Sequence, residues 1–450
     1  MCSVACSVVR LMVRLKVRSI SAIFTFAFIG LAGVVAPVAA AALTLEAVLA
    51  HADSNHPELA SAQAQSDLAQ AEWQWAHSLN DFRVTLDASL RSGRNPVFND
   101  AFQPDHWLKL NARKTLYDFG RQSAKVEAAD LERAARDLQL LDARAQRRIG
   151  LMARYFDVLL ADMQDAAETE AMAVAYVNWD NAKDRLALGQ IAPWELAELE
   201  ARQLEAVTRR NDVRRGLRAK RMALAAAMNL PTMVLDNLLD PKLSANDRTL
   251  LEYDELLAKM LATNPRLLAQ KQRLAAASQH LNSVRADERP NVEFEAETAA
   301  WRRDSTTRDN VRAGFNIVWP LWQGGRQDAR LRREQAHFHA LQAEHDKLLI
   351  ELRESLLAAR EEIHFLRGSA RRTAELNATY REVALEKARA EYEMELKTNL
   401  GSSMAETQFA QLRRRGIEYR LALAWARMDA LLGEISAQTP ATLPPMELKK

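Results

Sequence analysis

The 450-residue chain is poor in the residues that interrupt helices, with only 14 glycines and 13 prolines. No proline occurs in residues 105–192 or in residues 321–439. Because a proline inside a helix removes a hydrogen bond and clashes with the preceding turn, these two stretches permit uninterrupted helices of unusual length. Alanine, leucine, glutamate and arginine are abundant, as is typical of long helices and coiled coils.

Cysteine is almost missing, and both copies, Cys2 and Cys6, lie in an N-terminal segment unlike the rest. There, four basic residues precede an apolar run over residues 20–35, and small residues follow. This order predicts a secretory signal peptide over residues 1–41. An uncleaved anchor is the alternative, although the apolar run is short for spanning a bilayer. The cysteine-free remainder would need no disulfide and would be stabilised by packing or oligomerisation.

The chain also lacks an excess of charge and the common catalytic motifs. The signal segment contains four basic and no acidic residues, so its removal changes the net charge from +2 to −2. A nearly neutral chain without a basic patch predicts no nucleic-acid partner. There is no nucleophile elbow, phosphate loop or HExxH motif. His337 and His339 would point to different sides of a helix. We therefore expect no enzyme activity, no cofactor and no metal site.

What the chain does contain is an internal duplication. The helix opening at Pro57 recurs at Pro265, and residues 116–121 recur as residues 321–326, an offset of about 205 to 208 residues. This period is far longer than that of solenoid repeats, so each copy is half of one architecture. The predicted domains are a first repeat over residues 42–230, a linker over 231–250, a second repeat over 251–434 and a disordered tail over 435–450.

Each repeat contains helices that are long by the standard of globular proteins. The first repeat predicts a helix over residues 121–188, which at 1.5 Å per residue would be roughly 100 Å long. Its apolar positions are mostly alanine and leucine between many charges, which favours a narrow helix–helix seam over a bulky core. The other predicted helices cover residues 43–79, 194–228, 251–287, 327–396 and 402–432.

Between these helices lie four segments in which apolar and polar residues alternate, as in strands with one apolar and one polar face. They cover residues 83–91, 108–113, 292–298 and 311–319. Two hairpins lying on a soluble helical core are one interpretation. If the strands instead cross a membrane, the polar positions are candidates for lining a pore: Asp87, Lys109, Arg113, Glu293, Glu295 and Glu297.

Length and aromatic placement favour membrane strands, because about ten residues suffice to cross a bilayer when tilted. Aromatic residues gather at both ends of the segments, as in the girdles of transmembrane barrels. They are Phe82, Tyr117, Trp319 and Trp322 at one end, and Phe98, Phe102, Trp107 and Trp301 at the other. Four strands cannot close a barrel with a channel, and open edges are not tolerated in lipid. A trimer would supply twelve strands.

The order and duplication of these motifs resemble the TolC-type outer-membrane factors (the outer membrane efflux protein family). The resemblance covers residues 43–433 and rests on the openings at Pro57 and Pro265, the joints at 116–121 and 320–326, and the turn at 185–189. It implies an α+β fold: a homotrimer in which a twelve-stranded antiparallel transmembrane β-barrel continues into a long α-helical coiled-coil tube. The linker and tail would form part of an equatorial belt.

The resemblance also implies a function and a place in the cell. The chain would be the passive exit duct of a tripartite efflux pump or a type I secretion system, in the outer membrane and periplasm of a Gram-negative cell. Its partners would be outer-membrane lipid, a periplasmic adaptor protein and, indirectly, an inner-membrane transporter. A secreted coiled-coil spacer without a channel is the alternative, and it would contain no barrel.

In this family the helix turns at the periplasmic tip close the tube, and the resemblance assigns residues to that gate. Glu195, Tyr392 and Lys397 would form the latch, and Arg185, Leu186 and Gly189 would contact the hairpin of the adaptor.

One departure from the family concerns the inside of the tip. Where some members carry a ring of aspartates, this chain has Gly401 and Met404. An acidic constriction would therefore need Glu406 or Glu195.

Overall fold

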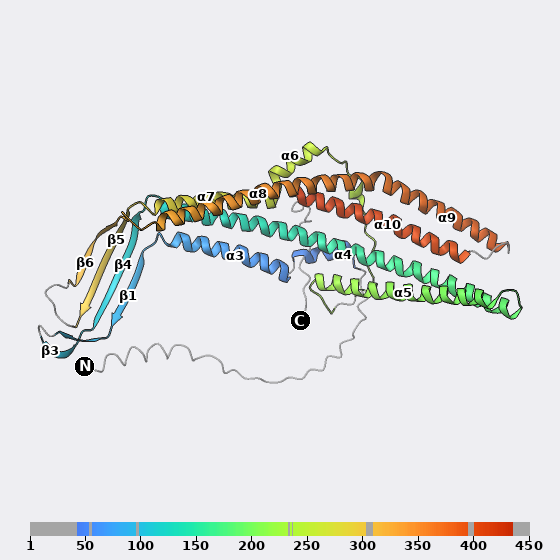
Figure 1. Cartoon of the computed structure of the whole chain (residues 1–450), viewed down its shortest axis with the longest axis horizontal. Coiled ribbons are helices and arrows are strands. Elements are labelled where there is room, and N and C mark those ends of the chain that lie inside the picture. Colours follow the sequence, from blue (N-terminus) through green and yellow to red (C-terminus); the bar gives the residue numbers. More distant parts are fainter. Residues whose placement is uncertain are drawn as a thin grey trace, which may run out of the picture. The chain divides into compact units, whose positions relative to one another are not determined.

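The computed structural model describes residues 43–53, 56–95, 99–232, 235, 237–302, 309–394 and 400–434. The predicted signal peptide over residues 1–41 and the predicted tail over 435–450 lie outside these ranges. Helices dominate the described part, and two sheets accompany them (Figure 1). Within the described ranges, none of the helices combines the length and the apolar character that crossing a bilayer requires.

The described part of the first half contains two short helical turns, three longer helices and four strands. In chain order they are α2 (Leu45–Ala50), the 3-10 turn η1 (His51–Asp53), α3 (Pro57–Ser78), β1 (Arg83–Ser89), β2 (Ser92–Asn95), β3 (Asn99–Pro104), β4 (Trp107–Tyr117), α4 (Arg121–Ala187) and α5 (Pro193–Ala227). The 67 residues of α4 follow from the proline-free stretch. The hairpin of β2 and β3 was not predicted, because its residues are mostly polar and show no alternation.

The second half repeats the order of short helix, longer helix, sheet strands and long helices, but a π-helical turn interrupts its first long helix. Its elements are the 3-10 turn η2 (Ser244–Asp247), α6 (Tyr253–Thr263), α7 (Pro265–Ala286), β5 (Asn291–Trp301), β6 (Val311–Val318), α8 (Arg326–Phe365), the π-helical turn η3 (Leu366–Ala370), α9 (Arg371–Glu393) and α10 (Leu400–Leu431).

The single helices expected over residues 43–79 and 251–287 are therefore wrong, since the first is interrupted before α3 and the second is broken at Asn264. The Asn264 side chain accepts a hydrogen bond from the Leu267 amide (2.9 Å) and starts α7, with Pro265 in its first turn. Asparagine caps and prolines at the first position are common ways to begin a helix.

A glycine lies in each of the sharp turns that connect a strand to the long helix after it. Gly120 before α4 has φ 86°, and Gly325 before α8 has φ 75°. A side chain is disfavoured in this left-handed region, so the two glycines account for the duplicated joint motif of the sequence.

The long helices lie side by side in two rows that share α4. In one row α3, α4, α7 and α8 contact one another in that order, and in the other row the order is α5, α4, α10 and α9. Alanine is the commonest buried residue of α4, which lets its neighbours approach closely: Ala124, Ala128, Ala135, Ala161, Ala167 and Ala182.

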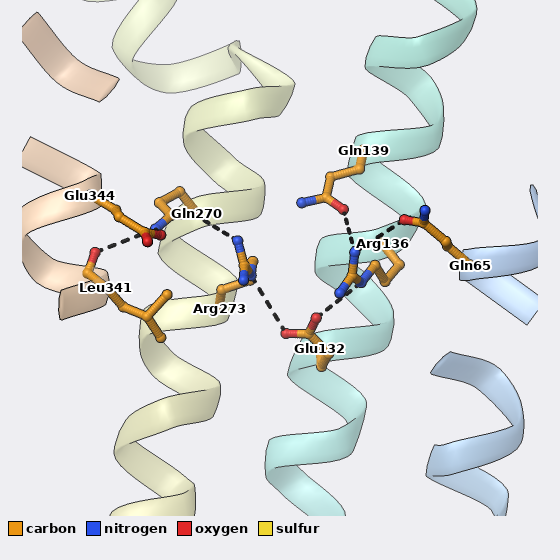
Figure 2. Close-up of polar contacts among 8 residues, drawn as sticks. All are labelled: Gln65, Glu132, Arg136, Gln139, Gln270, Arg273, Leu341 and Glu344. Carbon is orange, nitrogen blue, oxygen red and sulfur yellow. Dashed lines mark hydrogen bonds and ion pairs between the residues drawn. The ribbon is translucent and has the colours of Figure 1, made fainter. Parts of the chain in front are cut away.

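Polar side chains also join the helices of the first row (Figure 2). Glu132 on α4 contacts Arg136 (3.0 Å) and Arg273 on α7 (3.9 Å), and Arg136 reaches Gln65 on α3 (3.2 Å). Gln270 on α7 bridges onward to the Leu341 carbonyl of α8 (3.3 Å). The row is thus held by charged contacts as well as by small apolar residues.

Large buried side chains concentrate where the short helices cross the long ones. One cluster joins α2, α4, α5 and α10, where Phe156 and Tyr419 stack with ring centroids 4.5 Å apart. A second joins α6, α8 and α10 around Met260, Leu356 and Trp425. Beyond both clusters, alanine is the commonest buried residue between the long helices.

The main sheet has the strand order β1-β4-β5-β6, and all three pairings are antiparallel. β1 starts shortly after α3, and β4 leads into α4, so one end of the sheet adjoins the helices. The opposite end carries the β2–β3 hairpin. The expected combination of long helices with four strands is confirmed.

Candidate pore-lining face and helix tips

One face of the main sheet is polar along all four strands. Asp87 lies opposite Lys109, Arg113 opposite Glu295, and Asn111 opposite Glu297. Opposite residues of antiparallel strands share a face, and every second residue returns to it. All six predicted pore-lining residues therefore lie on the same face: Asp87, Lys109, Arg113, Glu293, Glu295 and Glu297.

Ion pairs connect the charges of this face across the strands. Arg113 lies 3.2 Å from Glu295 and 3.8 Å from Glu293. Glu297 is contacted from both neighbouring strands, by Lys109 (3.5 Å) and by Arg312 (3.1 Å). The carboxylates of β5 thus sit between cations of β4 and β6. With Arg83 and Asp87, the polar face carries four basic and four acidic side chains.

The other face is apolar and exposed to solvent in the protomer. Leu86 is 65% exposed, Phe315 73% and Ile317 66%. Contiguous exposed apolar surface of this kind marks contact with a membrane or another protein. Lys114 is an exception on this face, and its Nζ lies 5.0 Å from the centre of the Phe82 ring. Such a side chain can reach the interface while its stem remains among apolar groups.

The expected aromatic girdles fit the exposed side chains at one end of the sheet and are partly wrong at the other. Beside the helices, Phe82, Tyr117, Trp319 and Trp322 are all exposed. At the far end Phe102 is exposed, and Phe98 lies outside the described residues. Trp107 and Trp301 lie opposite each other on the polar face with Lys109, so they cannot belong to a lipid-facing girdle. The expectation was based on nearness to the strand ends and left out the face of the sheet on which each aromatic side chain lies.

The first helix tip is a tight turn between α4 and α5, built around Gly189. Gly189 has φ 68°, its N–H donates to the Leu186 carbonyl, and the Gln190 N–H donates to the Arg185 carbonyl (2.8 Å). This pair of bonds is the Schellman motif that ends helices at a glycine. Pro193 then opens α5. Arg185, Leu186 and Gly189 therefore share one turn, and the neighbouring Leu188 is 72% exposed.

Two of the three predicted latch residues, Glu195 and Tyr392, lie within the described ranges. Glu195 lies in the first turn of α5, and Tyr392 lies in the last turn of α9, the helix at the other end of the same row. Lys397 falls in residues 395–399, outside the described ranges.

The second tip explains why the chain has Gly401 where an aspartate could stand. A Cβ atom on Gly401 would lie 2.9 Å from Val174 Cγ2 of α4, so the glycine lets α10 approach α4 closely. Glu406 forms an ion pair with Arg381 of α9. The carboxylate proposed as a substitute for the aspartate ring is therefore already paired inside the protomer.

Sequence reasoning missed a polar clamp on the linker. The hydroxyl of Tyr155 donates to the carbonyl oxygens of Leu43 and Leu239, and that of Tyr419 donates to Asp240 (2.8 Å). Burial raises the pKa of Tyr155 to about 12. Burial, followed by the bond to Asp240, raises the pKa of Tyr419 as well. These contacts join positions far apart in the chain, so no local sequence pattern predicts them.

A buried arginine was also missed. The Arg147 guanidinium donates to the carbonyls of Ala52 (2.9 Å), His51 (3.2 Å) and Ala227 (3.0 Å). Burial lowers its pKa. Ala227 ends α5 and His51 follows α2, so the cation lies where carbonyl groups at helix C-termini favour positive charge. Arg147 looks like one more surface charge in the sequence of a helix rich in arginine.

Comparison with known proteins identifies this architecture. The family model of outer membrane efflux proteins matches residues 256–434. The match covers most of the second half of the chain. This match confirms the resemblance to TolC-type outer-membrane factors and the expected outer-membrane localisation, and it agrees with the expectation of a passive channel rather than an enzyme. Comparison with curated protein sequences gives no significant match.

Solved structures extend the likeness of the efflux domain to most of the chain. The outer membrane protein VceC from Vibrio cholerae is 20% identical, with a TM-score of 0.69 over 86% of this chain and 96% of that protein. The CmeC outer membrane channel of Campylobacter jejuni is 15% identical (TM-score 0.72, covering 87% and 85%). The open state of the MtrE outer membrane channel of Neisseria gonorrhoeae is 16% identical (TM-score 0.69, covering 86% and 88%). At these identities the likeness establishes the fold, which is that of outer membrane channels.

Proposed function

We propose that three copies of the chain form the passive exit duct of a tripartite efflux pump, with the polar face of the main sheet lining a pore through the outer membrane. The observation that carries this proposal is that the protomer ends in unpartnered edges in both its sheet and its helices. The homology to outer membrane efflux channels, established above, supplies the class of function.

The sheet has two edge strands, β1 and β6, each hydrogen-bonded on one side within the described protomer. Exposed strand edges cannot remain open in lipid, where every backbone polar group needs a partner. Pairing β6 of one copy with β1 of the next satisfies both edges. Three copies supply twelve strands, an even number within the range of known outer-membrane barrels.

The second row of helices, in the order α5, α4, α10 and α9, also ends in two edges, α5 and α9. Each presents exposed residues at alternating steps of three and four, which is the spacing of a coiled-coil seam. We call these the α5 seam and the α9 seam. The α5 seam consists of Trp194, Ala197, Ala201, Leu204, Thr208, Asn211, Arg215, Arg218 and Met222. The α9 seam consists of Leu376, Tyr380, Val383, Lys387, Ala390 and Met394.

The α5 seam of one copy would pack on the α9 seam of the next. α5 begins at the tip and α9 ends there, so the two helices run antiparallel. Leu204 and Val383 lie about the same number of residues from the tip and would meet across the interface. The repeated contact closes the helices into a tube.

Cysteine crosslinking tests this assembly. Because the only cysteines are Cys2 and Cys6, a background with both changed to serine is free of thiols. In it, Leu204→Cys combined with Val383→Cys should form disulfide-linked trimers in isolated outer membranes under mild oxidation. Glu205→Cys with Val383→Cys is the matched control, because Glu205 is exposed but lies off the seam. Absence of covalent trimers, or equal yields from both pairs, would contradict the assembly.

At the tip we propose that Arg185, Leu186 and Gly189 contact the hairpin of a periplasmic adaptor protein. The exposed Leu188 and Trp194 beside them offer apolar surface for it. A photo-crosslinker at Leu188 should capture the adaptor in cells, whereas one at Leu110 on the sheet should not. Capture at Leu110 alone would contradict docking at the tip.

We further propose that Glu195, Tyr392 and Lys397 hold the resting tip closed between copies. One exposed ion pair contributes roughly 0.2 to 1 kcal/mol, so three symmetric copies are needed to bias the gate. Lys397→Glu combined with Tyr392→Phe should raise single-channel conductance in planar bilayers. Unchanged conductance would remove the latch assignment and leave the duct intact.

The same duct would serve a type I secretion system, since the inner-membrane transporter rather than the duct selects the cargo. The alternative of a secreted spacer is disfavoured, because a spacer needs neither a sheet with an exposed apolar face nor an efflux domain.

A further inference from the structure

Two tryptophans and a lysine form a compact cluster on the polar face, at the end of the sheet far from the helices. Trp107 and Trp301 are cross-strand partners with ring centroids 6.2 Å apart. The Nζ of Lys109 lies 5.1 Å from the centre of the Trp107 ring and 4.8 Å from that of Trp301. Cations held within about 6 Å of indole rings are attracted by the negative faces of the rings.

A carboxylate completes the surroundings of the ammonium group. Glu297 Oε1 lies 3.5 Å from Lys109 Nζ, and the Glu297 side chain is only 8% exposed. The Trp301 indole N–H donates to the Asp309 carbonyl (3.4 Å), and the Arg302 N–H donates to the His106 carbonyl (2.8 Å). The last bond ties together the strand ends that carry the rings, so the cluster is held in place from several sides.

Two aromatic faces and a carboxylate are the groups that proteins use to bind quaternary ammonium ions. We propose that Trp107, Trp301 and Glu297 form an organic-cation site at the outer mouth of the duct, and that Lys109 is its built-in occupant. This inference rests on the proposed function, in which the polar face lines the pore. The occupant keeps cationic cargo from being retained at the exit, because an incoming cation must first displace Lys109 from both rings and from Glu297.

Removing the lysine ammonium should therefore convert the mouth into a binding site. We expect tetraethylammonium, added to the outer side of single channels in planar bilayers, to block the Lys109→Met channel reversibly. Its apparent affinity should be about tenfold higher than for the unmodified channel, in line with the usual strength of cation–aromatic contacts. Methionine keeps the length of the stem and removes the charge. Lys109→Gln is a second variant with the same expected block.

Two controls isolate the site. Lys114→Met removes a lysine from the opposite face of the sheet and should leave tetraethylammonium sensitivity unchanged. Adding Trp107→Leu to Lys109→Met should abolish the block, since one wall of the site is lost. If both Lys109 variants conduct but are no more sensitive than the unmodified channel, the inference is overturned and the duct stands. If the unmodified protein forms no channel, the proposed function fails, and the inference fails with it.

Discussion

At the residue scale, β5 shows how strongly the alternation of a strand separates neighbouring side chains. Phe294 and Glu295 are adjacent, yet Phe294 packs near Phe82 and Phe315 on the apolar face while Glu295 pairs with Arg113 on the polar face. Phe294→Arg should reduce trimer assembly, because a lipid-facing arginine is unfavourable by up to roughly 2–4 kcal/mol, depending on its depth in the bilayer.

The matched substitution is Glu295→Arg, which places the same side chain on the polar face. It loses an ion pair but remains beside water, so most of the trimer should persist. The measurement is the amount of detergent-resistant trimer in isolated outer membranes. Equal amounts from the two variants would mean that the assigned faces are wrong.

Some of these residue positions follow from sequence and others do not. Alternation alone placed Asp87, Lys109 and Glu297 together, because opposite residues of paired strands must share a face. It could not reveal the ion pairs, which depend on which strands are neighbours. The roles of Tyr155 and Tyr419 depend on contacts with a linker that is distant in sequence, and a pattern within one helix carries no record of them.

At the element scale, two glycines of α10 differ in what surrounds them. Alanine at Gly416 would make an ordinary contact with Leu160 Cδ2 at 3.7 Å, whereas alanine at Gly401 would meet Val174 at 2.9 Å. A glycine inside a helix costs about 0.5–1 kcal/mol relative to alanine. Gly416→Ala should therefore raise the unfolding midpoint in detergent, and Gly401→Ala should gain less or lose stability. A larger gain for Gly401→Ala would contradict the close approach of α4 and α10.

Elements with a long sequence pattern were predicted, whereas elements with a short pattern were missed. The absence of proline predicted α4 over nearly its whole length, because nothing within it could stop a helix. The break between α6 and α7 was missed although its signal, Asn264 followed by Pro265, was visible. The β2–β3 hairpin has no alternation and little apolar content, so its sequence carries no strand pattern.

At the scale of the whole molecule, the proposed pore wall has balanced charges. Its four basic and four acidic side chains predict little preference between small cations and anions. Arg312→Gln removes three positive charges from a trimer and leaves Glu297 with one cation fewer. The reversal potential in a KCl gradient should shift toward cation selectivity. Lys114→Gln, on the apolar face, should produce no shift, and an equal shift in both would contradict the proposed lining.

The assembly itself is the level that one chain predicts least directly. The need for more than four strands follows from the rule that lipid tolerates no open edge. The number of copies depends on how the edges meet in space, which no pattern within one copy encodes. The α5 and α9 seams became recognisable only once the order of the helices in the row was known.

The π-helical turn η3 between α8 and α9 accommodates one extra residue in this long helix. The buried side of this long helix includes Leu352 and Ile363 before the turn, Leu366 at its first position and Ala378 after it. From Leu366 to Ala378 is twelve residues, one more than alternating steps of four and three allow. A π-turn absorbs one extra residue in a helix. Without it, every later side chain would be rotated by about 100°.

A one-residue deletion within the π-helical turn η3 should therefore be tolerated. Removing Gly368 should turn the π-turn into ordinary α-helix and keep the α9 seam facing its neighbour. Removing Glu386, within α9, should rotate the final turns off the seam. Trimer yield and the unfolding midpoint in detergent would compare the two deletions, and equal damage from both would refute the insertion. If Gly368 is dispensable, the buried faces of α8 and α9 stay aligned because the π-helical turn absorbs one extra residue.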